Sequence, residues 1–338
     1  MRESARVHAA VAGVFFAFGA GVGLWGGAAG AILARAHIDP AAFGALLTAY
    51  TAAYLIAMSA AGALAHRFGV MKVLPVSAIA FGAALCALLN AGSAPLVGGL
   101  LIISGLGGVA DVTMNAEGAR IERRLGRPIL ARLHAAASAG MAIGAILGSL
   151  IVASRTPWAA GLAYGRAAEG EPGPATVAFP SGVRGLSFSP ALIGLGIVIG
   201  VSIAAETAAL LWSTLLLRAE APKLAAIAGL GGAFFSACQM TLRFNADVIR
   251  LRFSDQRIIV GSFAVATAGF AIVAAGRGFG LSIAGFALIG IGTGAIVPCA
   301  FALAARQSAG QPAIGLSSAS LFSALTRLPA PLATGAIA

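Results

Sequence analysis

The sequence predicts an all-α membrane protein, a polytopic bundle of about ten or eleven transmembrane helices in two pseudo-repeated halves. The chain of 338 residues is 59% hydrophobic and only 10% charged, which leaves too little polar surface to cover a water-soluble globule. Ten apolar stretches reach or nearly reach the about 20 residues that a helix needs to cross a bilayer. Such long runs exclude a β-barrel, in which about ten residues alternate along each strand.

Five of these stretches precede residue 155 and five follow residue 190. We expect them at 8–33, 41–64, 73–92, 95–116, 129–153, 191–217, 223–242, 258–276, 279–305 and 313–338. The domains are accordingly an N-terminal half (1–155), a polar linker or degenerate sixth helix (156–190) and a C-terminal half (191–338). We also expect the chain to end within an eleventh element, without a twelfth helix.

An internal repeat favours a degenerate sixth helix over a linker that stays outside the membrane. A shift of 185 residues places Arg67 on Arg252 and Lys72 on Arg257, and it aligns two Gly-x-Gly sequences. This period leaves room for a sixth element in each half, so the halves are predicted to be parallel repeats. The alternative, in which 156–190 does not cross and the second half inverts, stays open.

The net charge of +11 does not indicate a nucleic-acid-binding protein, because the basic residues are spread over the ends of apolar stretches. Their excess in alternate loops predicts a multi-pass protein of the inner (plasma) membrane with a cytoplasmic amino terminus. The three cysteines and four histidines lack the spacing of a metal site, and no phosphate-binding motif occurs. We therefore expect no metal and no cofactor.

Each half contains a basic loop after its second apolar stretch. The first loop combines two glycines with basic residues, and the second combines an acid with basic residues: Gly62, His66, Arg67, Gly69 and Lys72, then Asp247, Arg250 and Arg252. This pattern resembles the loop G-x-x-x-D-R-x-G-R-(R/K) of the major facilitator superfamily of secondary transporters, with His66 in place of the acid. By that resemblance, these residues, together with Glu117 and His134, form cytoplasmic loop and gate elements.

A second set of residues is similar to the fucose-permease-like branch of the sugar and drug permeases. It consists of Asp111, Asn115, Glu117, Glu122, His134, Ser138, Glu206 and Trp212. The resemblance covers nearly the whole chain except 154–190 and the carboxyl end. It implies the major facilitator fold and alternating access, but it does not identify the substrate.

Carboxyl groups within apolar stretches are the candidate proton carriers, since a low dielectric favours their neutral form. Glu206 lies near the middle of its stretch and is either the carrier or a carboxyl bonded to a neighbouring helix. Asp111 and Asn115 share a helical face near the cytoplasmic end, where a gate is favoured over substrate contact.

Arg327 could pair with Glu206 or bind an anionic substrate. Gln239, Trp25 and Trp212 are secondary candidates for a central site, although packing is the simpler role for both indoles.

The leading hypothesis is a monomeric secondary transporter of a small sugar or drug-like solute, coupled to protons and embedded in lipid. The alternative is a non-transporting protein of the same fold, either decayed or serving as a scaffold. An enzyme is not expected, because the four histidines lie near helix ends without an acid or base at helical spacing.

Overall fold

The computed structural model describes residues 2–125, 129–154, 187–307 and 312–337, and within these ranges every regular element is helical. The first side of the bundle contains α1 (Arg2–Ala36), α2 (Pro40–Phe68), α3 (Val70–Asn90), α4 (Ala94–Ser104), α5 (Gly107–Leu125) and α6 (Leu130–Ser154). The second contains α8 (Pro190–Glu220), a 3₁₀ turn (Pro222–Ile227), α9 (Leu230–Arg252), α10 (Asp255–Ala274), α11 (Phe279–Thr293), α12 (Ile296–Gln307), α13 (Pro312–Arg327) and α14 (Ala330–Ile337). The all-α membrane fold is confirmed.

Eight segments of the described chain are long and apolar enough to cross a membrane, two fewer than the ten stretches predicted. Two of the eight, Ala94–Glu122 and Phe279–Gln307, each join two consecutive helices, α4 with α5 and α11 with α12. The seventh predicted stretch corresponds to α9, whose Gln239, Arg243 and Asn245 lower its hydropathy. The tenth is divided at Pro329 into α13 and α14, neither of which spans by itself. Proline lacks the amide hydrogen that a continuous helix needs, which explains the break.

The internal repeat reappears in the helix bounds. Helix α3 begins at Val70 and α10 at Asp255, and α4 begins at Ala94 and α11 at Phe279, so both pairs of starts are 185 residues apart. In each half the span that follows α3 or α10 consists of two helices with a break between them: α4 and α5 in the first half, and α11 and α12 in the second. The two halves therefore repeat the same order of elements.

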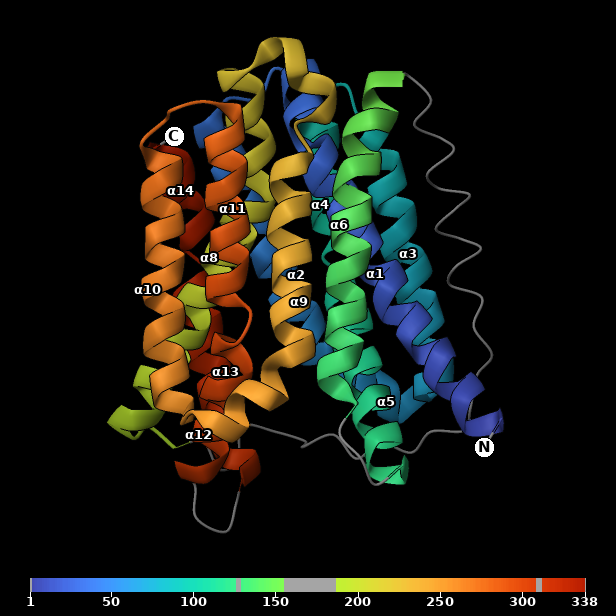
Figure 1. The fold of residues 1–338 in the computed structure, drawn as a ribbon. Helices are drawn as coiled ribbons and strands as arrows, with labels where there is room; N and C mark the ends of the chain where they lie inside the picture. The colour runs from blue at the N-terminus through green and yellow to red at the C-terminus, as the bar shows by residue number, and fades with distance from the viewer. Residues whose placement is uncertain (1, 126–128, 155–186, 308–311, 338) are drawn as a thin grey trace.

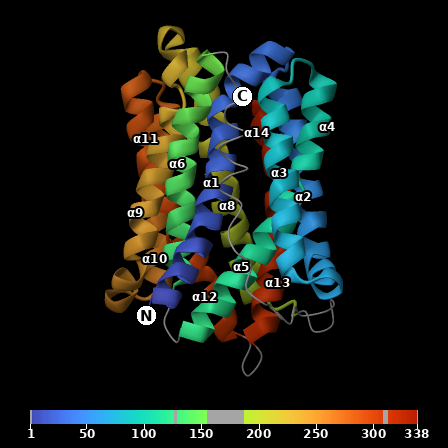
Figure 2. The ribbon, with the colours of Figure 1, turned by 90° about the vertical axis from the view of Figure 1, so that its right-hand side faces the viewer.

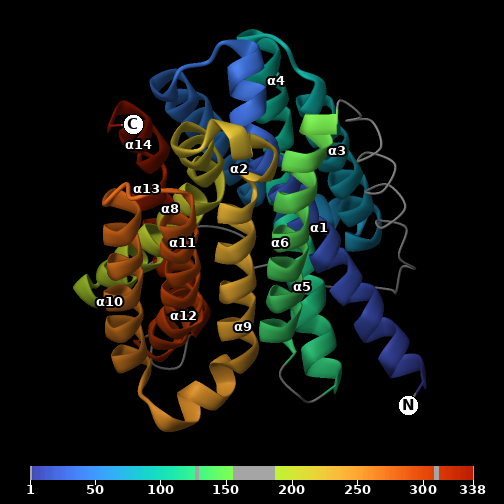
Figure 3. The same cartoon turned by 45° about the horizontal axis from the view of Figure 1, so that its top comes forward.

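The helices of each half pack mainly with one another, and the two groups occupy largely separate sides of the bundle in Figure 1. Helix α1 packs along α6, and α8 packs against α13. Contacts across the halves join α6 to α9, α2 to α14 and α1 to α8. Figure 3 shows α6 lying between α1 and α9.

Glycines allow the closest helix pairs to approach. A Cβ added to Gly19, Gly23 or Gly27 of α1 would lie about 2 Å from a carbonyl oxygen of α6 (1.9, 2.1 and 2.0 Å). The reverse holds for Gly140 and Gly144 of α6, at 2.0 and 2.2 Å from carbonyl oxygens of α1. Small residues replace side-chain contacts by backbone contacts, which is a common way to join helices in lipid.

The amino terminus and the two basic turns lie at the same end of the bundle (Figure 2). Gly69, between α2 and α3, has a φ of 82° and donates its amide to Ala65, so this position favours glycine. In the second half, the hydroxyl of Ser254 accepts from the amide of Arg257 and caps α10. The chain thus reverses its direction at both turns, but different residues stabilise the two reversals.

Helix α6 ends at the opposite end, whereas α8 begins at the end with the basic turns (Figure 1). The segment that was predicted to be a linker or degenerate helix, 156–190, lies outside the described residues except for 187–190. The three-part domain division therefore stays a prediction.

Candidate functional site

A cavity of about 350 Å³ lies between the two sides of the bundle. Its walls come from α1, α2, α5, α6, α8, α9, α12, α13 and α14, so both halves contribute. Most lining atoms are apolar. The polar and charged lining residues are Tyr50, Thr51, Tyr54, Asp111, His134, Glu206, Thr207, Gln239, Arg243, Arg327 and Thr334.

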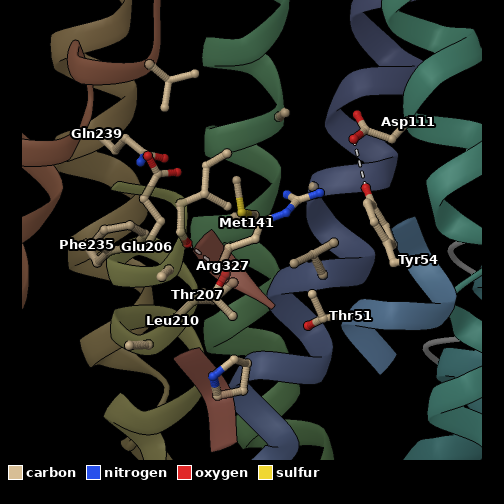
Figure 4. A pocket seen from close by; sticks show the side chains of 18 of the residues that line it. Thr51, Tyr54, Asp111, Met141, Glu206, Thr207, Leu210, Phe235, Gln239 and Arg327 are labelled. Atoms are coloured by element: carbon tan, nitrogen blue, oxygen red, sulfur yellow. Dashed lines mark hydrogen bonds between the residues drawn. The ribbon is translucent and has the colours of Figure 1, made fainter. Parts of the chain in front are cut away.

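Asp111 occupies the N-terminal part of α5, just after the break that separates this helix from α4. The hydroxyl of Tyr54 on α2 donates to its Oδ2 atom at 2.8 Å, and the amide of Asn115 donates to its Oδ1 atom at 2.8 Å. Figure 4 shows the tyrosine hydrogen bond at one side of the cavity. The carboxyl thus has two neutral donors from two helices of the first half.

Glu206 lies across the cavity on α8 and is paired with Arg243 of α9, with Nη2 and Oε2 3.1 Å apart. Nη1 of the same guanidinium donates to Ser138 on α6 at 3.0 Å, which joins the two halves. Ser138 in turn lies 3.3 Å from the amide oxygen of Gln239, and the amide nitrogen of Gln239 donates to Thr293. Within the described residues, the second carboxyl oxygen of Glu206 is buried without a hydrogen-bond partner.

Arg327 is the last residue of α13, at the break before α14. It extends from α13 toward the side of the cavity formed by Tyr54 and Asp111 (Figure 4). Its charge interacts electrostatically with Asp111, Tyr50 and Tyr54. The suggested pair between Arg327 and Glu206 does not form here, since Arg243 is the partner of Glu206.

The remaining central candidates separate into lining and packing residues. Trp212 lines the cavity and contacts Phe43, with ring centroids 5.2 Å apart. Trp25 is buried in an apolar cluster, outside the cavity lining, and its ring also contacts Phe43. His134 lines the cavity, and its ring packs edge-on against Phe15 rather than bonding to Asp111 or Glu117 among the described contacts.

The other predicted loop and gate residues, unlike His134, lie away from the cavity lining. His66, Arg67, Lys72 and Arg252 are exposed at the basic turns. Gly62 is a half-buried residue of α2, and Glu117 pairs with Arg120 on its own helix at 2.8 Å. Asp247 belongs to α9, but its side chain lies outside the described residues.

At the second basic turn, Asp255 forms two ion pairs, although the sequence did not single it out as a candidate. It begins α10, is 6% exposed, and binds Arg250 (2.9 Å) and Arg306 of α12. Helix starts favour acidic residues, which is the signal that could have identified it.

Arg243 and the two tyrosines of α2 are the ionisable residues of the cavity lining that sequence reasoning missed. Arg243 lies close to the basic loop in the sequence, but it also lies four residues after Gln239 and hence on the same face of a helix. That spacing could have identified it. Tyr50 and Tyr54 share a face in the same way, but nothing in their local sequence distinguishes a cavity from a packed interface.

Two curated relatives resemble this chain over nearly its whole length. An uncharacterized transporter of Sinorhizobium fredii is 28% identical, and the alignment covers 97% of this chain and 90% of the relative. An uncharacterized MFS-type transporter of Yersinia pestis is 26% identical, with coverage of 96% and 87%. No family model matches the chain.

Solved structures show the same fold at low sequence identity. A variant of the nucleoside transporter NupG has a TM-score of 0.76 and 12% identity, and the match covers 98% of this chain and 90% of NupG. The inward-open xylose transporter XylE from E. coli has a TM-score of 0.66 and 14% identity, covering 99% and 89%. A variant of the E. coli fucose:proton symporter FucP has a TM-score of 0.56 and 15% identity, covering 98% and 96%.

These proteins are named as transporters and not as enzymes, in agreement with the expectation from the sequence. By sequence similarity and by fold, the chain therefore resembles transporters, one of them named as MFS-type, in agreement with the resemblance to the major facilitator superfamily expected from its motifs.

Proposed function

We propose that the protein is a proton-coupled secondary transporter of a small solute that works by alternating access. The observation that carries the proposal is the central cavity, which both halves line and which contains two carboxyl groups. Sites between repeated halves are where transporters of this kind bind solute and coupling ion. The neighbouring structures of sugar and nucleoside transporters support a hydroxyl-rich or similarly small solute.

Contacts across the halves support a state that is open toward the end with the basic turns. At the opposite end, α2 packs closely on α14: a Cβ added to Gly44 would lie 2.5 Å from the carbonyl oxygen of Pro331. Nearby, the hydroxyl of Thr214 on α8 donates to the carbonyl of Gly26 on α1 at 3.0 Å. If the basic turns are cytoplasmic, as we propose, these contacts close the outer side, and alternating access requires them to separate.

Asp111 is the better placed of the two carboxyl groups to carry the proton. Protonation of Glu206 would leave the charge of Arg243 without its counter-charge, which is costly in a partly buried site. The described hydrogen-bond donors of Asp111 are neutral, so its protonation breaks no direct ion pair. Glu206, the other candidate carrier, then has a positioning role with Arg243 across the halves.

Reconstitution into proteoliposomes tests this function. Wild-type protein should accumulate a radiolabelled solute from a panel of pentoses, hexoses, nucleosides and small organic acids when an inward proton gradient is imposed. Asp111→Asn should abolish gradient-driven accumulation but retain exchange of labelled for unlabelled solute, because exchange needs no net proton movement. Asp39→Asn is the matched control, since Asp39 caps α2 at the surface and asparagine is also a good cap.

Three outcomes would contradict parts of the proposal. Gradient-driven accumulation by Asp111→Asn would exclude this carboxyl as the carrier, and its loss in Glu206→Gln alone would assign the role to Glu206. A folded wild-type protein that moves no solute of the panel would support the alternative of a non-transporting protein of transporter fold.

A further inference from the structure

Arg327 is the cavity residue whose charge and hydrogen-bond donors are least satisfied. Among the described residues its Nε atom is buried without a hydrogen-bond partner. Its Nη2 atom lies 3.6 Å from the thioether sulfur of Met58, which is a weak acceptor. A guanidinium withdrawn from water in this way lacks the oxygen acceptors that normally offset its desolvation.

The other cavity charges do not supply those acceptors. The carboxylate of Glu206 is already paired with Arg243 at 3.1 Å. Asp111 interacts with Arg327 through space, but its described hydrogen bonds come from Tyr54 and Asn115. When Asp111 takes up a proton, Arg327 becomes the one charge of the described cavity lining that has no counter-charge.

We propose that Arg327 binds the carboxylate of a small organic acid, which is the solute that this protein transports. The inference rests on the proposed transport function and adds the substrate class. A guanidinium presents paired N–H donors that match the two oxygens of a carboxylate. The cavity of about 350 Å³ has room for the rest of a small molecule, with Thr51, Tyr50 and Thr334 as hydroxyl partners.

The first turn of α14 supports an anion at the same place. Ala330 and Pro331, which begin this helix, line the cavity directly after the break at Arg327. The amino-terminal end of a helix carries a partial positive charge, so it favours an anion beside the guanidinium.

Anion and proton should bind cooperatively. The positive charge of Arg327 favours ionised Asp111, and a bound carboxylate cancels that charge, so each ligand promotes the binding of the other. The titratable and charged groups near this pair are Tyr50 and Tyr54 of α2, with His134, Glu206 and Arg243 across the cavity. One monocarboxylate anion and one proton would then enter together, so that no net charge crosses the membrane.

Ligand protection of the purified protein against thermal unfolding tests the inference. The probes are matched pairs of an acid and a neutral analogue: lactate with propane-1,2-diol, and gluconate with sorbitol. Wild-type protein should be protected by at least one acid and much less by its neutral analogue. Arg327→Gln should weaken that protection by about tenfold or more in apparent affinity, and Arg327→Lys should weaken it less. Arg277→Gln removes the same charge from an exposed turn and should bind like wild type.

The pH dependence separates the coupled site from a simple surface anion site. The apparent affinity for the acid should rise as the pH falls in the wild type, and Asp111→Asn should remove this dependence. His134→Gln should retain it, which excludes the histidine as its source.

Equal protection by the acids and their neutral analogues, no protection by either acid, or unchanged acid binding in Arg327→Gln would overturn the inference. These failures can be distinguished from failure of the transport proposal. Uptake of a neutral solute without acid binding would support the transport proposal and contradict the carboxylate site. Acid binding without uptake of any solute would support the carboxylate site and contradict the transport proposal.

Discussion

Arg243 shows how much of the site depends on one side chain. Its guanidinium bonds to Glu206 of the second half and to Ser138 of the first, at 3.1 and 3.0 Å. The side chains of Arg243 and Glu206 are 15% and 18% exposed, so the pair is screened less than a surface ion pair. Removal of one partner leaves the other charge in a poorly solvated place.

A double-mutant cycle should detect this coupling. Glu206→Gln and Arg243→Gln should each lower the thermal stability of the detergent-solubilised protein, and the double variant should lose less than the sum. We expect a coupling free energy of about 1 kcal/mol or more, because contacting residues of one network are not additive. Additive losses would show that the pair contributes little to the stability of the described state.

At the scale of elements, the contact between α1 and α6 depends on glycine. A Cβ at Gly23 would lie 2.1 Å from the carbonyl oxygen of Met141, so the two backbones would have to separate. At Gly99 of α4, in contrast, no heavy atom lies within 4 Å of an added Cβ. The same substitution therefore has opposite consequences at these two helical positions.

Gly23→Ala should destabilise the protein by about 1–3 kcal/mol, as expected for overpacking of a tight interface. Gly99→Ala should change the stability by less than about 1 kcal/mol, and in the stabilising direction, because alanine is the better helix former. Thermal unfolding in detergent measures both. Equal stability of the two variants would mean that α1 and α6 adjust their separation without cost.

At the scale of the whole molecule, the position of both basic turns at one end predicts the orientation of the protein in the membrane. The turn after α2 and the turn after α9 carry exposed basic residues, among them Arg67 and Arg252. Positively charged loops stay on the cytoplasmic side, so both turns and the amino terminus should face the cytoplasm.

Single cysteines test this arrangement in a background in which Cys86, Cys238 and Cys299 are replaced by alanine. Cysteines at His66 and Arg252 should react with a membrane-impermeant maleimide in inverted vesicles but not in intact cells. A cysteine at Lys223, in the 3₁₀ turn at the opposite end, should show the reverse pattern. Labelling of the first two positions from different sides would exclude two parallel repeats.

The sequence by itself determined the fold class, the repeat and most helix bounds. Apolar run length decides whether a segment can span lipid, and this property is local, so α3 and α10 were predicted within a few residues. Glu206, Asp111 and Gln239 were also recognised, because polar groups are rare in such runs and are costly there unless they face a cavity.

Only the tertiary structure decided the partners of these groups. Arg243 reaches Glu206 across 37 positions of sequence, and Tyr54 reaches Asp111 across 57. Hydrogen bonds between helices depend on helix rotation and depth, which are determined by packing along the whole bundle and not by any local pattern.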